Sequence, residues 1–209
     1  MRTETLNAIE SYSTFNIPAS FTTCLNSVLV NAKTRDRFSL EYISDLLSPD
    51  NMYSSLWALD KLRTETSRSY ERLVCVGPDQ IILIKWLLIH NMVLETTVTS
   101  TNDIEGLIAN LVIGPKLQRF SNLTQAMYNQ TTEDLVINLH EEKADSTWYD
   151  AVKPGTTCII QTSNAKSLDN VNIVDSITEL TKVYPMSGLV YAGTLVFPQH
   201  KRLMIIGIR

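Results

Sequence analysis

The feature that most constrains the fold is a regular alternation of short apolar runs and helical segments, which begins near Arg72. The short runs have the length and the Val, Ile and Thr content of buried strands. Strands separated by helices of about 10–15 residues form βαβ units, and therefore a mostly parallel sheet. We predict such strands over Leu73–Val76, Val93–Thr99, Asp134–Leu139 and Thr156–Gln161.

The last two predicted strands break this alternation. Leu189–Phe197 and Arg202–Ile208 are joined by a tight turn at Pro198–Lys201. Parallel neighbours need a crossover of a dozen or more residues, so these two strands must be antiparallel. The predicted fold class is α/β, with a Rossmann-like, doubly wound, mostly parallel sheet and a C-terminal antiparallel hairpin. Helices are expected over Asp79–His90, from Asn102 or Asp103 to about Ile113, over Ser146–Val152 and over Ile173–Val183.

Residues 1–70 lack this alternation and are predicted to form a helical N-terminal lobe, ahead of an α/β domain at residues 71–209. Apolar residues recur with helical spacing over Phe38–Leu47. Ser48 can then cap a second helix, in which Pro49 takes the first position and the apolar pattern runs through Met52–Leu62.

The charge of the chain argues against phosphate binding as its main task. The chain has 18 Lys and Arg against 22 Asp and Glu, a formal net charge of −4, whereas nucleic-acid binding normally needs a clearly basic surface. The N-terminal part has local basic residues, which acidic neighbours dilute. These basic residues are Lys33, Arg35, Arg37, Lys61, Arg63, Arg68 and Arg72. A nucleic-acid-associated module that uses them is the weakest of the hypotheses that we consider for this chain.

The sequence also argues against several other classes. The start of the chain carries Arg2 and Glu4 without an apolar core, and the longest apolar run, Gln80–Ile89, is far shorter than the ~20 residues of a membrane span. We therefore expect a cytoplasmic protein with no membrane contact. Three scattered cysteines without a CxxC pair predict reduced, mostly buried thiols and no metal site. No Walker, HExxH or GxSxG motif is present, which argues against NTPases, zincins and serine hydrolases.

The C-terminal third carries a more specific signal, because its motifs follow a particular order. A predicted strand ends at Asn138, a short helix contains Trp148, a Lys-Pro-Gly turn follows, and the next strand leads into Gln161-Thr162-Ser163-Asn164. This order resembles a group of class I S-adenosylmethionine-dependent methyltransferase-like proteins of bacteria and phages. The resemblance covers about Leu73–Arg209 and is strongest in the second half of that range. It implies the doubly wound fold with the C-terminal hairpin, and it suggests a phage-encoded protein of the host cytoplasm. Further similar segments are Val171-Asn172, Tyr184–Ser187, Tyr191–Gly193 and Lys201–Gly207.

The loop that should hold the cofactor departs from the family. The resemblance implies small residues after the first strand, whose backbone N–H groups meet the methionine end of S-adenosylmethionine. The matching loop of this chain contains Gly77, Pro78 and Asp79. Pro78 has no N–H to donate, and Asp79 would repel the carboxylate of the cofactor.

Two acidic residues that the resemblance implies are also missing. The acid that binds the ribose corresponds to Thr99, and the acid beside the adenine corresponds to Ala126. Asp103 could replace the first of them, although it fits a helix cap better. Each buried bond to a charged group is worth about 1.5–3 kcal/mol, so losing two could weaken binding by about 100-fold or more. The sequence therefore predicts weak binding of S-adenosylmethionine, or none.

The carboxyl edge of a doubly wound sheet is where ligands bind, and polar residues are expected there. At the end of the Asp134–Leu139 strand, Asn138, His140 and Glu141 are candidate catalytic residues. His140 and Glu141 could act as base and orienter, or bind a metal with Glu142. Because adjacent residues point in different directions, a solvated acidic turn is the favoured interpretation.

Gln161 and Asn164 form a second group with Asn138 at the ends of adjacent predicted strands. Their amides could hydrogen-bond the planar polar edge of a substrate. They could equally tie the strand ends and loops to one another, and the sequence leaves both interpretations open.

The leading hypothesis is a diverged, non-catalytic methyltransferase-like protein that acts through contacts with a protein partner or a second copy. An active S-adenosylmethionine-dependent methyltransferase with an atypical cofactor loop is the alternative, so the sequence leaves open whether the chain is an enzyme. The apolar helix over Ile81–Ile89 offers more hydrophobic area than a one-sided helix needs. We therefore expect this helix or the N-terminal lobe to contact another chain.

Overall fold

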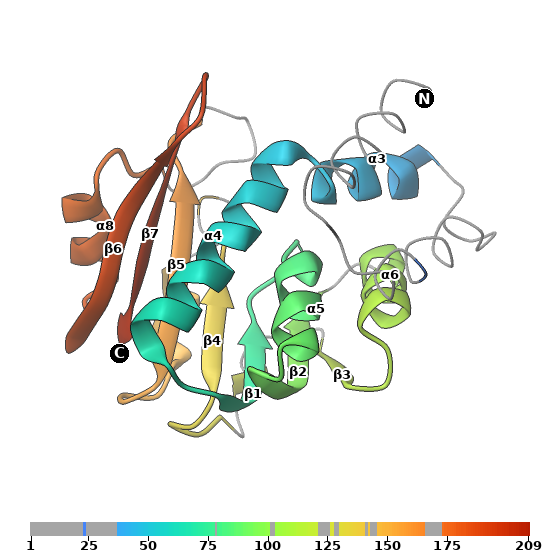
Figure 1. The fold of residues 1–209 in the computed structure, drawn as a ribbon, viewed down its shortest axis with the longest axis horizontal. Coiled ribbons are helices and arrows are strands. Elements are labelled where there is room, and N and C mark those ends of the chain that lie inside the picture. Colours follow the sequence, from blue (N-terminus) through green and yellow to red (C-terminus); the bar gives the residue numbers. More distant parts are fainter. Residues whose placement is uncertain are drawn as a thin grey trace.

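The computed structural model describes Thr23 and residues 37–77, 79–100, 103–120, 126–127, 130–140, 142, 146–165 and 173–209. In this part of the chain, helices flank a seven-stranded sheet (Figure 1). In chain order, the elements are α3 (Arg37–Leu46), α4 (Pro49–Thr66), β1 (Tyr70–Cys75), α5 (Ile81–Ile89), β2 (Val93–Thr99), α6 (Asp103–Ile113), β3 (Leu117–Phe120), β4 (Leu135–Asn138), the 3-10 helix η3 (Ser146–Ala151), β5 (Thr157–Ser163), α8 (Ile177–Val183), β6 (Gly188–Val196) and β7 (Lys201–Ile208).

The order of the strands across the sheet is β3-β2-β1-β4-β5-β7-β6. The pairs β1–β2, β1–β4, β2–β3 and β4–β5 are parallel. Strand β7 lies between β5 and β6 and is antiparallel to both. These pairings confirm the predicted doubly wound sheet with its C-terminal hairpin. The carboxyl ends of β1, β2, β4 and β5 consequently lie at one edge of the sheet.

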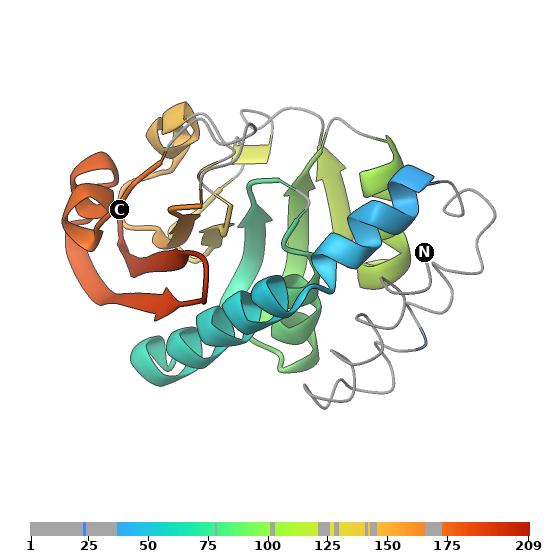
Figure 2. The same ribbon diagram turned by 90° about the horizontal axis from the view of Figure 1, so that it is seen from above.

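The two faces of the sheet are buried in separate hydrophobic clusters. Leu73, Ile137 and Ile159 face the cluster that includes residues of α3, α4, α5 and α6. Val74 and Val136 face the other cluster, to which η3 and α8 contribute. Figure 2 shows α4 and α5 on one side of the sheet and α8 and η3 on the other. This alternation is typical of strands that are covered on both faces.

Most predicted element ends lie within two residues of the observed ones. Ser48 caps α4 by accepting a hydrogen bond from the Asn51 N–H at 3.4 Å, and Pro49 is the first residue of the helix. Helix α8 is shorter than predicted, because the Ser176 hydroxyl accepts from the Glu179 N–H at 3.2 Å and caps the helix later in the chain. Strand β3 was not predicted, since its four residues form no apolar run.

Helix α5 is covered on all sides within the chain. All of its residues except Lys85 and Ile89 are buried, and it packs against α4, α6 and β2. Its large apolar surface therefore serves the packing of α3–α6 on the sheet. Contact of this helix or of the N-terminal lobe with another chain stays a prediction.

Candidate functional site

The candidate site lies at the carboxyl ends of β1, β2 and β4, where the loop after β1 bonds to β2. Gly77 has a φ of +88°, a left-handed conformation that favours glycine. The Gly77 N–H donates to Thr99 Oγ1 at 2.9 Å, and the Thr99 hydroxyl donates to the Cys75 carbonyl at 3.3 Å. Thr99, at the position where the resemblance implies a ribose acceptor, is therefore already hydrogen-bonded to the loop.

Gln80 closes the same loop from its other end. Its side chain is buried, Nε2 donates to the Val76 carbonyl at 2.8 Å, and Oε1 accepts from Cys75 Sγ at 3.0 Å. Burial, together with the nearby charge of Asp79, raises the pKa of the Cys75 thiol. Cys75 is thus a protonated donor and has no nucleophilic character.

Two further positions concern the cofactor, namely the implied adenine acceptor at Ala126 and the possible ribose acceptor Asp103. Ala126 is buried within the second hydrophobic cluster. Asp103 is the first residue of α6, one position after the cap that it was predicted to form, and its side chain lies outside the described part of the chain. Burial, assisted by the charges of Asp79 and Glu105, raises the pKa of Tyr42. Tyr42 belongs to α3, so this helix lies close to the loop after β1.

The residues after β4 are buried, which corrects the expected solvated turn. His140 is 8% exposed and Glu142 is 3% exposed. The distance from His140 Nδ1 to Glu142 Oε1 is 3.7 Å, and Glu142 Oε2 accepts from the Ser163 N–H at 2.9 Å. These partners compensate the burial of the carboxylate, which would otherwise be very costly. Glu141 lies outside the described residues.

Arg202 reaches this position from β7. Its guanidinium donates to the Leu139 carbonyl at 3.2 Å and to Asn51 Oδ1 at 2.9 Å. Burial lowers the pKa of Arg202, an effect that the charge of Glu142 opposes. Burial by itself raises the pKa of Glu142, but His140 and Arg202 outweigh it, so this pKa lies below its ordinary value. Glu142 is therefore ionised at neutral pH.

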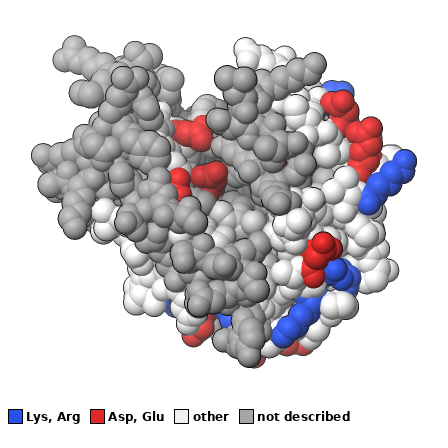
Figure 3. Space-filling view, turned by 180° about the vertical axis from the view of Figure 1, so that it is seen from behind, with Lys and Arg blue, Asp and Glu red and all other residues white. Residues whose placement is uncertain are grey.

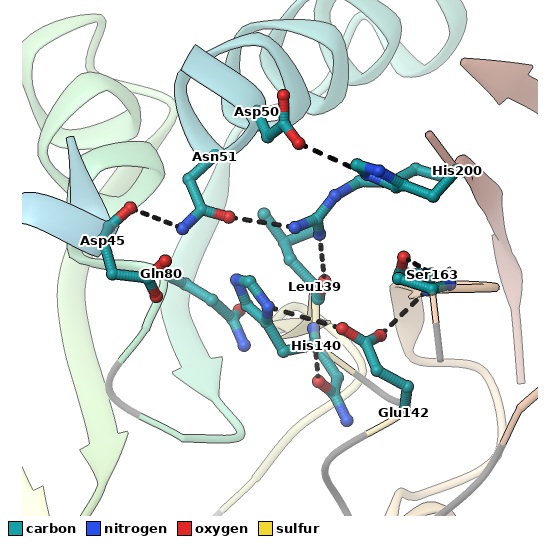
Figure 4. Close-up of polar contacts among 12 residues, drawn as sticks. Asp45, Asp50, Asn51, Gln80, Leu139, His140, Glu142, Ser163 and His200 are labelled. Carbon is teal, nitrogen blue, oxygen red and sulfur yellow. Dashed lines mark hydrogen bonds and ion pairs between the residues drawn. The ribbon is translucent and has the colours of Figure 1, made fainter. Parts of the chain in front are cut away.

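Figure 4 shows how the start of α4 meets these residues. Asn51 Nδ2 donates to the Asp45 carbonyl at 2.7 Å, and Asp50 Oδ2 lies 3.4 Å from His200 Nε2 in the hairpin turn. Residues from the α3–α4 junction, the end of β4 and the C-terminal hairpin thus form one polar group. We call Asn51, Asn138, His140, Glu142 and Arg202 the Arg202 cluster.

Each of the three predicted amides, Asn138, Gln161 and Asn164, makes a hydrogen bond within the protein. Asn138 Oδ1 accepts from the His140 N–H at 3.1 Å. Gln161 is fully buried and donates to a carbonyl of α4 at 3.2 Å, and Asn164 Oδ1 accepts from the Lys201 N–H at 2.7 Å. These contacts favour the interpretation that the amides tie strand ends and loops together.

Two buried nitrogens of the Arg202 cluster have no partner within the described part of the chain, namely Asn138 Nδ2 and Arg202 Nε. His140 Nδ1 differs from them, because it faces Glu142 Oε1 at 3.7 Å. Buried donors without a partner are costly, so Asn138 Nδ2 and Arg202 Nε are the atoms that could hold a small polar molecule. The sequence identified Asn138 and His140 but gave no signal for Asn51 or for the burial of Arg202.

The described residues contain neither a metal centre nor a membrane-spanning helix. No group of three or more His, Cys, Asp or Glu side chains could hold a metal ion, and no helix of that part has the length and apolarity needed to cross a membrane. A hollow of about 330 Å³ beside Arg72, Glu95 and Asp134 lies at the amino ends of the strands, opposite the candidate site. In the described part of the face in Figure 3, basic and acidic side chains are intermixed.

Comparisons with known proteins identify the fold. No protein-family model and no curated protein matches the chain. Among solved structures, the N-methyltransferase NodS from Bradyrhizobium japonicum in complex with S-adenosylhomocysteine matches with a TM-score of 0.54 and 10% identity, over 91% of this chain and 99% of NodS. An O-methyltransferase family protein from Burkholderia thailandensis has a TM-score of 0.51 and 10% identity, over 88% and 67% of the two chains. A variant of MtNAS in complex with S-adenosylmethionine has a TM-score of 0.50 and 12% identity, over 91% and 72%. The chain therefore has the fold of the class I S-adenosylmethionine-dependent methyltransferases.

Proposed function

We propose that this chain is a diverged, non-catalytic protein with the methyltransferase fold, which does not use S-adenosylmethionine and acts through contacts with protein. The observation that carries the proposal is the 2.9 Å hydrogen bond from the Gly77 N–H to Thr99 Oγ1. A loop N–H that bonds to its own β-sheet is not available to the carboxylate of a cofactor. A threonine hydroxyl that already makes two bonds is a poor substitute for a carboxylate that accepts from both ribose hydroxyls.

Two further features support the same conclusion. The Gln80 side chain bonds to the Val76 carbonyl and to the Cys75 thiol, so these two groups are already occupied and not open to a ligand. Ala126, at the position implied for the adenine acceptor, is buried in an apolar cluster and has no polar side-chain atom. The loop, the ribose acceptor and the adenine acceptor have thus all changed in a direction that weakens binding.

A thermal melt with and without cofactor tests this proposal. A ligand present at 100 times its Kd adds about 2.7 kcal/mol to the stability of the folded state and raises the Tm by several degrees. We expect millimolar S-adenosylmethionine to leave the Tm unchanged. A clear rise in the Tm would contradict the proposal.

An active methyltransferase is the second candidate function, favoured by one observation. The buried His140–Glu142 pair follows β4 at the edge of the sheet where ligands bind. An imidazole beside a carboxylate can accept a proton from a nucleophile that is being methylated.

The second candidate is tested by following the formation of S-adenosylhomocysteine from S-adenosylmethionine in the presence of extracted small molecules and macromolecules. The active-enzyme hypothesis expects turnover that His140→Gln abolishes, whereas His200→Gln, in the hairpin turn, retains it. Our proposal expects no turnover by any of the three proteins.

A further inference from the structure

Strand β6 forms one edge of the sheet and has an unpaired outer side in the described part of the chain. It pairs with β7 alone. The Phe197 N–H donates to the His200 carbonyl at 2.9 Å, so these two residues form a hydrogen-bonded pair. Hydrogen-bonded and non-hydrogen-bonded pairs alternate along an antiparallel ladder, so Val196, Thr194 and Ala192 belong to non-hydrogen-bonded pairs. Their backbone N–H and C=O groups therefore point away from β7.

This edge carries neither charged side chains nor proline, two features that usually prevent an edge strand from pairing with another chain, although its register is irregular between Leu189 and Tyr191. Its nine residues form a long uncharged edge, and such edges are templates for a further strand. Leu189 is 51% exposed and Val196 is 69% exposed. The opposite edge is different, because β3 has only four residues and contains Arg119, and Lys116 precedes it.

Helix α4 holds β6 in place from one face. Trp57 Nε1 donates to the Tyr191 hydroxyl at 3.2 Å, and the two rings meet edge to face with centroids 6.2 Å apart. A Cβ atom at Gly193 would lie 2.2 Å from the Tyr191 hydroxyl, so this ring covers the glycine closely. The outer edge is therefore held in a fixed strand conformation, and little conformational entropy would be lost when another strand is added.

We propose that β6 pairs antiparallel with β6 of a second copy of this chain. Two features of the strand fit a second copy as the occupant. A strand without charge places no like charges opposite one another when it pairs with itself. The irregular register between Leu189 and Tyr191 confines regular pairing to Tyr191–Val196, so the two-fold axis lies near Gly193. In this arrangement, the exposed Val196 of one copy lies beside the exposed Leu189–Val190 end of the other.

The pairing would join two seven-stranded sheets into one continuous sheet across the dimer. The inference rests on the proposed function, because it names the protein contact through which a chain without a cofactor would act. It leaves the cofactor loop of each copy outside the interface, since that loop lies at the carboxyl ends of β1 and β2.

Sedimentation velocity on the full chain at micromolar concentrations tests the inference. We expect a dimer for the wild type and monomers for two variants. Thr194→Lys places the lysines of the two copies close to the two-fold axis, and Val196→Lys places each lysine beside the apolar Leu189–Val190 end of the other copy. Leu94→Lys is the matched control, since Leu94 is an exposed apolar strand residue at 58% exposure on β2 and should leave the dimer intact. An equimolar mixture of Thr194→Lys and Thr194→Glu should restore dimers. A monomeric wild type, or a Thr194→Lys protein that remains dimeric while circular dichroism shows it folded, would overturn the inference.

The same samples separate this inference from the proposed function. A wild-type dimer that Thr194→Lys dissociates, and that also binds S-adenosylmethionine, would support the β6 interface and contradict the cofactor-free proposal. A wild-type monomer that binds no S-adenosylmethionine would overturn the interface and leave the cofactor-free proposal in place.

Discussion

Arg202 Nη2 lies 2.9 Å from Asn51 Oδ1 and thereby joins β7 to the first turn of α4, residues 151 positions apart in the chain. The other terminal nitrogen of Arg202 bonds to the Leu139 carbonyl after β4. A single buried side chain thus connects the N-terminal helices, the end of a central strand and the C-terminal hairpin. The polar contacts of the Arg202 cluster therefore contribute to the assembly of the fold.

Replacing Arg202 tests this connection. Arg202→Met should lower the free energy of unfolding by about 3–5 kcal/mol, because it leaves the Leu139 carbonyl and Asn51 Oδ1 without their donor and removes a positive charge near the buried Glu142. The neighbouring Lys201→Met is the control, since Lys201 is exposed and its loss should cost less than about 0.5 kcal/mol. Urea denaturation of both variants measures the difference, and equal losses would show that Arg202 has no special role.

The pH dependence of stability tests the ionisation of Glu142. Its folded-state pKa lies below the ordinary 4.5, so the ionised carboxylate stabilises the fold above that pH. This contribution is lost as the pH falls from about 4.5 through the lower folded-state pKa. Glu142→Gln should be about 1–3 kcal/mol less stable than the wild type at pH 7, and the difference should shrink in more acidic solution. Glu65→Gln, on the exposed side of α4, should show no such convergence, and a difference in Glu142→Gln that stays constant with pH would contradict this account.

Two threonines of β2 provide a matched test of the cofactor loop. Thr99→Val removes the acceptor of the Gly77 N–H and should cost about 1 kcal/mol. Thr97→Val should be neutral or stabilising, because the Thr97 hydroxyl is buried and has no hydrogen-bond partner among the described residues. Thermal unfolding of the two variants distinguishes them, and a larger loss in Thr97→Val would show that the loop bond contributes nothing.

Two glycines test the packing of the C-terminal hairpin. A Cβ atom at position 207 would lie 2.5 Å from the Gly188 carbonyl oxygen and 2.5 Å from Met186 Sδ. Gly207→Ala should therefore destabilise the fold by about 1–3 kcal/mol. The nearest atom to a Cβ at position 188 is Ile208 Cγ1 at 3.7 Å, an ordinary contact, so Gly188→Ala should be tolerated. Similar effects of both substitutions on the Tm would contradict the β6–β7 register.

The sheet and its hairpin could be predicted from the sequence because their signals are local. Apolar runs of strand length, breaks at Gly and Pro, and the short turn at Pro198–Lys201 determined the class and direction of the strands. The short edge strand β3 was missed, because a strand of four residues with Lys116 before it and Arg119 within it carries no apolar pattern. The start of α8 could have been found from Ser176 and Glu179, which have the spacing of a capping box.

The Arg202 cluster as a whole could not be predicted, because its members come from three distant segments. The burial of His140 and Glu142 depends on Arg202 and on the N-terminus of α4, and neither contact leaves a trace in the residues next to them. The acidic composition of the segment after β4 pointed instead to solvent. The packing of α5 against α4 and α6 was likewise a tertiary effect that the apolar sequence of the helix did not reveal.

Calorimetric titration of the wild-type chain with S-adenosylmethionine tests the central claim most directly. The closed loop at Gly77, with Thr99 and Ala126 at the positions implied for two carboxylates, predicts no measurable heat of binding up to millimolar cofactor. Binding with a Kd below about 100 μM, a free energy better than about −5.4 kcal/mol, would contradict the account. It would make the active methyltransferase the leading hypothesis and Asp103 the first candidate for the ribose ligand.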